Sequence, residues 1–156
     1  MKKWIIALVL MPVLAFAEEP LELFWEDLIP EDYQLPEQLV DHEANNNMVQ
    51  QNLDAPVVEA LNGSVVRIPG FVVPLEGDEE KLTEFLLVPF FGACIHVPPS
   101  PPNQIIYVKF PPAAPVQQLW DATYVVGTLK TETMSHELAE TGYLIEGTAI
   151  TEYDDQ

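Results

Sequence analysis

The pattern of apolar and polar positions changes near residue 64, where short runs rich in β-branched and aromatic residues begin. Such runs, bounded by Gly, Pro and polar residues, are typical of β-strands. The strands that this pattern predicts occupy residues 64–73, 84–88, 105–110, 124–130 and 142–150. The apolar positions expected to form their common core are Val66, Ile68, Phe71, Leu86, Val88, Ile106, Val108, Val126, Leu129 and Leu144.

The breaks between these runs indicate how the strands connect. Residues 62–63 (Asn-Gly) and 77–80 have the composition of turns. Residues 69–70 (Pro-Gly) interrupt the first strand, where we expect a bulge or a sharp bend. Two prolines at residues 111–112 are expected to end the third strand, and residues 115–121 leave room for one helical turn.

These features predict a mainly β protein, a small five-stranded OB-like Greek-key barrel with a short helical N-terminal region. A generic antiparallel sheet with helices on one face is the other arrangement that fits. The expected organisation is a signal peptide at residues 1–17, an acidic arm with short helices at 18–62, and the OB-like β domain at 63–156.

The first 17 residues have the pattern of a secretory signal peptide rather than of a folded element. Lys2 and Lys3 form a basic start, an apolar run follows, and residues 15–17 read Ala-Phe-Ala. We expect cleavage after Ala17 and a periplasmic location, with no membrane span in the mature chain. A buried N-terminal helix is the alternative.

The segment that follows is acidic and rich in apolar residues at one point. Residues 18–43 hold ten acidic side chains and no Lys or Arg. We expect this arm to dock on the barrel through Phe24, Trp25, Leu28 and Ile29, because a wholly disordered tail would leave these groups in water. Residues 36–61 favour one or two short helices.

Charge and cysteine content exclude several classes of function. The chain has 25 acidic and 6 basic residues and a formal charge of −19, so it lacks the cations that a nucleic-acid backbone or a basic membrane helix would require. A single Cys excludes an internal disulfide framework and a multi-cysteine zinc site. The chain carries no recognisable catalytic motif, so we expect that it is not an enzyme.

Cys94 and His96 lie directly before a proline-rich run and are the main candidates for chemistry. In an extended chain residues i and i+2 point to the same side, so the thiolate and the imidazole could share a Zn²⁺ ion. Glu76 and His136 are the further ligand candidates. Two other interpretations stay open: a buried Cys beside a hydrogen-bonded His, and a Cys nucleophile.

Several motifs together resemble a family of bacterial periplasmic proteins that contain a domain of unknown function. They include a G-A-C-I-H-x-P-P-x-P-P-N-Q motif at residues 92–104, in which Ser100 interrupts the prolines. The other motifs lie at residues 25–30, 60–63, 68–75 and 84–89. The resemblance implies an accessory protein encoded near ABC-transporter genes, some of them zinc-responsive, and it implies no enzymatic activity.

We therefore expect a periplasmic accessory protein of an ABC-transporter-linked system that binds a divalent metal such as zinc. Its expected partner is an ABC transporter or another envelope protein. The alternative is a metal-free OB-like protein-interaction module of an envelope complex, and a thiol enzyme is a third class.

Overall fold

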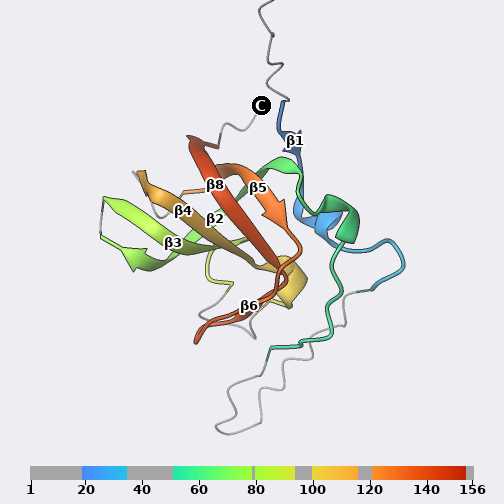
Figure 1. The fold of residues 1–156 in the computed structure, drawn as a ribbon. Helices are drawn as coiled ribbons and strands as arrows, with labels where there is room; N and C mark the ends of the chain where they lie inside the picture. The colour runs from blue at the N-terminus through green and yellow to red at the C-terminus, as the bar shows by residue number, and fades with distance from the viewer. Residues whose placement is uncertain (1–18, 35–50, 79, 94–99, 116–120, 154–156) are drawn as a thin grey trace, which may run out of the picture.

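The fold was obtained as a computed structural model, which describes residues 19–34, 51–78, 80–93, 100–115 and 121–153 (Figure 1). Five long strands form its centre: β2 (Val65–Gly77), β3 (Lys81–Val88), β4 (Ile106–Pro115), β5 (Thr123–Lys130) and β8 (Tyr143–Glu152). The short elements are β1 (Leu21–Glu22), β6 (Met134–Ser135), β7 (Glu140–Thr141) and the 3₁₀ turns η1 (Trp25–Leu28), η2 (Glu59–Leu61) and η3 (Pro102–Gln104). None of the helices in these ranges is long and apolar enough to cross a membrane.

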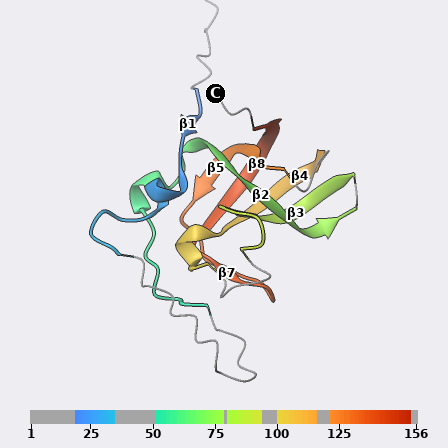
Figure 2. The ribbon, with the colours of Figure 1, turned by 180° about the vertical axis from the view of Figure 1, so that it is seen from behind.

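The five long strands close into a barrel, which Figure 2 shows from behind. Their order is β2-β3-β4-β8-β5, and β5 pairs again with β2. The pairing of β4 with β8 is parallel, and the other four pairings within the barrel are antiparallel. The predicted mainly β fold, a five-stranded barrel, is confirmed.

Strand β2 takes part in two ladders because it bends in its middle. Residues 65–70 pair with β5, and residues 71–77 pair with β3. A side chain at Gly70 would place its Cβ atom 2.8 Å from the Val88 carbonyl oxygen, so only glycine lets β3 approach at the bend. The predicted bend at Pro69 and Gly70 is therefore present, while the register shifts lie further on, between Pro74 and Gly77.

Strand β4 does not end at Pro111, so this expectation was wrong. The strand continues to Pro115, and its last residues pair with the start of β3. Between Lys109 and Ala114 the register shifts, so the prolines fall where no regular ladder bond to β3 is required. Most of the helical turn expected at 115–121 lies outside the described residues.

The apolar residues form two clusters. The main cluster fills the barrel, and it includes Val66, Ile68, Val108 and Leu129. The second cluster lies on the outer face of β3 and β4 under the β6–β7 hairpin; its buried members are Leu86, Val88, Ala93, Ile105, Tyr107, Ala139 and Leu144. The predicted core positions are buried in one cluster or the other, except that Phe71 and Val126 are only partly buried.

The N-terminal arm extends the barrel and packs into its main cluster. Leu23 and Leu28 are 4% and 0% exposed, whereas Phe24, which was expected to dock, is 54% exposed. The Tyr143 hydroxyl donates a hydrogen bond to the Leu28 carbonyl oxygen at 2.9 Å and accepts one from the Val58 N–H at 2.6 Å. In the described part of 36–61 only η2 is helical.

Candidate functional site

The two principal candidates, Cys94 and His96, lie outside the described residues, and the chain is described up to Ala93 and again from Ser100. Ala93 is fully buried in the second cluster, and Ser100 is 7% exposed. Both ends of this segment are therefore held against the barrel.

The side-chain amide of Gln51 joins one end of this segment to the β6–β7 hairpin. Its Nε2 group donates to the carbonyl oxygen of Ser100 at 2.8 Å and to that of Glu140 at 2.7 Å. Its Oε1 atom accepts the Glu140 N–H at 2.8 Å. One side chain thus satisfies three backbone groups from two distant parts of the chain, an arrangement that we call the Gln51 clamp.

Residues 103–104 (Asn-Gln), which follow the proline run, tie η3 to the N-terminal region. Asn103 Nδ2 donates to the Pro56 carbonyl oxygen at 3.0 Å, and Gln104 Nε2 donates to the Trp25 carbonyl oxygen at 2.9 Å. Both side chains are buried, and Asn103 Oδ1 has no hydrogen-bond partner among the residues that the structure describes. A pair of amides between prolines and an apolar strand was the sequence signal for this anchor.

Glu76 lies at an acidic corner on the outer face of the barrel. It pairs in register with Glu84 on β3, and the Tyr107 hydroxyl donates a hydrogen bond to the Glu84 carboxylate. Burial, the hydrogen bond to Glu84 and the charges of Glu84 and Glu76 raise the pKa of Tyr107 to about 12. The Lys109 ammonium lies 5.9 Å from the centre of the Tyr107 ring.

His136 lies in the exposed turn of the β6–β7 hairpin, an element that the sequence pattern did not predict. Its backbone N–H donates to the Ala139 carbonyl oxygen at 3.0 Å. Its ring Nδ1 atom accepts the Leu138 N–H at 3.3 Å. The imidazole therefore stabilises its own turn.

Three of the four predicted ligands are neighbours of residues in the second cluster. Leu75, Ala93 and Met134 all pack in that cluster, and they lie next to Glu76, next to Cys94 and two residues from His136. The fold thus brings Leu75, Ala93 and Met134 to one side of the barrel. Within the described ranges, no group of three or more His, Cys, Asp or Glu side chains could hold a metal ion.

Three phenylalanines lie near the same segment, Phe90 and Phe91 exposed and Phe71 partly buried, and we call them the phenylalanine edge. Phe90 and Phe91 follow β3 and are 48% and 59% exposed. The Phe91 ring stands edge-to-face on that of Phe71, with 6.3 Å between centroids and 72° between planes. Two adjacent aromatic residues outside every predicted strand were the signal for this feature.

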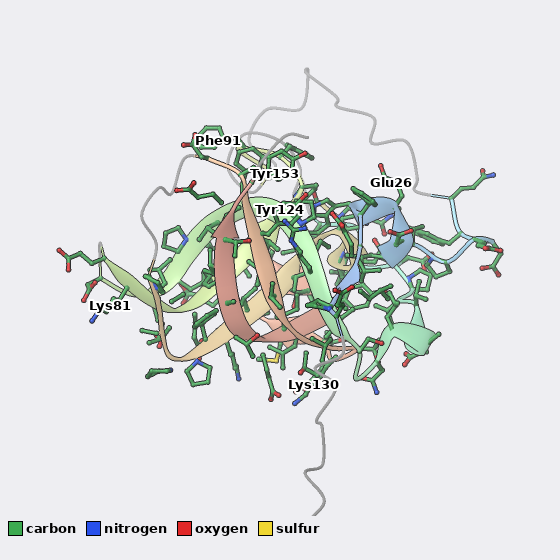
Figure 3. All side chains as sticks on the ribbon, turned by 90° about the horizontal axis from the view of Figure 1, so that it is seen from above. Glu26, Lys81, Phe91, Tyr124, Lys130 and Tyr153 are labelled. Carbon is green, nitrogen blue, oxygen red and sulfur yellow. The ribbon has the colours of Figure 1, made fainter. Side chains whose placement is uncertain are left out.

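Arg67, the single arginine of the chain, lies on the β2–β5 side of the barrel. Its guanidinium carbon is 3.6 Å from the centre of the Tyr124 ring, and its Nη1 atom is 3.8 Å from Glu22 Oε1. Figure 3 shows Tyr124 beside Tyr153, whose ring centroid is 5.2 Å away. An open hollow of about 490 Å³ adjoins this group and is lined by Arg67, Val126, Thr151 and Glu152. Because Glu22 belongs to β1, the cluster ties the arm to the barrel.

Comparisons with known proteins agree with this architecture. Residues 25–152 match the family model described as "Protein of unknown function (DUF3299)". A crystal structure of a DUF3299 family protein from Pseudomonas aeruginosa PAO1 is 43% identical in sequence, with a TM-score of 0.77. The match covers 89% of this chain and 99% of that one. A comparison with curated proteins gave no match. The chain therefore belongs to the DUF3299 family.

Proposed function

We propose that this protein is a periplasmic accessory protein that binds a divalent metal such as Zn²⁺ and serves an envelope system linked to an ABC transporter. Cys94 and His96 would supply the thiolate and the imidazole that a borderline-soft cation prefers. The observation that supports this proposal is that Leu75, Ala93 and Met134 all pack in the second cluster. In the sequence these residues lie one or two positions before Glu76, Cys94 and His136.

The surrounding structure is suitable for a ligand-bearing loop. Ala93 and Ser100 are buried, and the Gln51 clamp fixes Ser100 against Glu140. Binding residues on loops that a rigid scaffold holds lose less conformational freedom when the ligand arrives. The formal charge of −19 also raises the concentration of cations near the surface. The link to a transporter comes from the family resemblance of the motifs.

Isothermal titration of the reduced mature protein with Zn²⁺ tests the metal site. We expect one tight site in the wild type and much weaker binding in Cys94→Ser and His96→Ala. Affinity should fall as the pH is lowered, because protons compete for the thiolate and the imidazole. Glu76→Gln and His136→Ala then test the remaining ligands.

Glu26→Gln is the matched control, because Glu26 is an exposed carboxylate on the N-terminal arm (Figure 3). Equal affinity in the wild type, Cys94→Ser and His96→Ala would remove this pair from the site. The absence of any binding would favour the alternative proposal, a metal-free interaction module that docks on an envelope complex.

The location is tested independently of the metal. N-terminal sequencing of protein from the periplasmic fraction should begin at Glu18. A chain that retains Met1 in the membrane fraction would show that the first segment is a membrane anchor and would contradict a cleaved signal peptide.

A further inference from the structure

The outer face of β3 and β4 is the part of the barrel that this protein covers with its own chain. Among OB-type barrels, the face of the second and third strands is the usual binding surface. Here Leu86, Val88 and Tyr107 on that face are buried, and Met134 and Ala139 of the β6–β7 hairpin pack with them. Among the described apolar residues of this face, those along its margin on β2 stay partly accessible.

That margin is an apolar stripe on a single strand. Phe71, Val73 and Leu75 alternate along β2 and are partly buried against the second cluster, so their outer surfaces remain in contact with solvent. At one end Phe91 stands on Phe71, and Phe90 lies beside it in sequence. Because the stripe rests on a paired strand, its shape is fixed before any partner binds.

The other end of the stripe is acidic. Glu76 directly follows Leu75 and is exposed, and it pairs with Glu84 across the strands. From Phe71 to Glu76 the strand spans roughly 16 Å, at about 3.3 Å per residue. This is the length that an extended segment of about five residues would cover.

Three of the four basic side chains in the described ranges contact other side chains of the protein, and the fourth, Lys81, begins β3. Arg67 contacts Glu22 and the Tyr124 ring, Lys130 Nζ lies 2.5 Å from Glu146, and Lys109 lies over the Tyr107 ring. With 25 acidic and 6 basic residues in the chain, the surface field around the stripe is negative. An apolar partner that carries lysine or arginine would therefore be attracted and an acidic one repelled.

We propose that the phenylalanine edge and the β2 stripe form a docking surface for an extended segment of another protein, in which apolar residues are followed by lysine or arginine. The apolar residues would cover Phe91, Phe71 and Val73, and the cations would face Glu76 and Glu84. This inference deepens the proposed accessory role by naming the partner's chemistry, and it does not require a bound metal.

Phage display tests the proposal. A random peptide library is selected on the wild-type protein in the presence of a chelator. We expect enriched peptides that combine aromatic or aliphatic residues with Lys or Arg. Synthetic versions should bind the Phe90→Ser/Phe91→Ser variant roughly tenfold or more weakly, the size of loss typical for central interface aromatics. Glu76→Gln should reduce the dependence of binding on salt concentration.

Phe24→Ser is the matched control, because Phe24 is exposed to a similar extent and lies on the N-terminal arm. Any of three results would overturn the proposal. Enriched peptides could lack an excess of basic residues, they could bind the double variant as tightly as the wild type, or no peptide could be enriched. A dimer of the wild type that the double variant loses would also overturn it, since the occupant would then be a second copy. Unchanged thermal unfolding of the double variant confirms that it folds. The chelator keeps this result separate from the zinc titration, so either proposal can fail alone.

Discussion

The indole N–H of Trp25 donates a hydrogen bond to the carbonyl oxygen of Pro69 at 2.7 Å. Two residues earlier in each segment, the backbone N–H of Leu23 donates to the Arg67 carbonyl oxygen at 2.9 Å. The indole therefore takes the place of a strand N–H and continues the ladder that β1 begins. These bonds lie just before the point at which β2 turns to pair with β3, so the arm covers backbone that β3 leaves open.

Replacement of Trp25 by Phe tests this role of the indole. The variant keeps an aromatic ring but removes the donor to Pro69, which should cost about 0.5–1.5 kcal/mol of unfolding free energy. Urea denaturation of the wild type and Trp25→Phe measures the difference. Phe24→Leu, at an exposed neighbouring position, should change stability by less than about 0.5 kcal/mol. Equal stability of Trp25→Phe and wild type would show that the bond to Pro69 contributes nothing.

The second cluster should contribute to stability as a packed core, although it lies outside the barrel. Leu86 is fully buried there, so Leu86→Ala should lower the unfolding free energy by about 2–5 kcal/mol. Leu53→Ala is the control, because Leu53 is 58% exposed. If both variants unfolded at the wild-type denaturant midpoint, the outer face of β3 would not be a core.

The strands could be predicted because their information is local. Runs of β-branched residues identified all five barrel strands, and the Pro69-Gly70 pair identified the bend in β2. The end of β4 was misplaced because a register shift between Lys109 and Ala114 accommodates the prolines, and that shift depends on the partner strand. Strands of two residues, such as β6 and β7, are too short for an alternating pattern to reveal.

The candidate site could be predicted only in part, since its contacts join distant residues. Gln51 contacts Ser100 and Glu140, which are 49 and 89 residues away, and no spacing in the sequence reports such pairs. The exposure of Phe24 and burial of Leu23 were likewise decided by which side of the arm faces the barrel. The role of Cys94 and His96 stays a prediction.

Alkaline pH should destabilise the protein through Tyr107. Its pKa is raised from 10.0 to about 12 in the folded state, so folding favours the protonated phenol. The resulting stabilisation is fully present below the unfolded pKa near 10 and is lost as the pH rises to about 12, because only the unfolded chain then releases the proton.

Unfolding free energies at several pH values between about 9 and 12 check this expectation. Tyr107→Phe should make the decline of the unfolding free energy with pH shallower, by up to about the slope that the release of one proton on unfolding produces. Phe24→Leu, which changes an exposed residue without an ionisable group, is the control and should leave the decline unchanged. Identical slopes for Tyr107→Phe and wild type would mean that Tyr107 titrates alike in both states.

The Gln51 clamp should govern local opening of the β6–β7 hairpin. Gln51→Leu keeps a side chain of similar size but leaves the carbonyl oxygens of Ser100 and Glu140 and the Glu140 N–H without their partner.

Unsatisfied groups in part-buried positions should cost about 1–3 kcal/mol, and the Glu140 amide should exchange its hydrogen faster by roughly one to two orders of magnitude. Native-state hydrogen exchange measures this, with Asn52→Ala as the control because the Asn52 side chain accepts a local hydrogen bond from the Asp54 N–H. Unchanged protection of Glu140 in Gln51→Leu would show that the hairpin is held by its packing on the second cluster instead. Faster exchange at Glu140 with unchanged exchange in β5 would show that one amide side chain fastens this edge of the barrel without supporting its core.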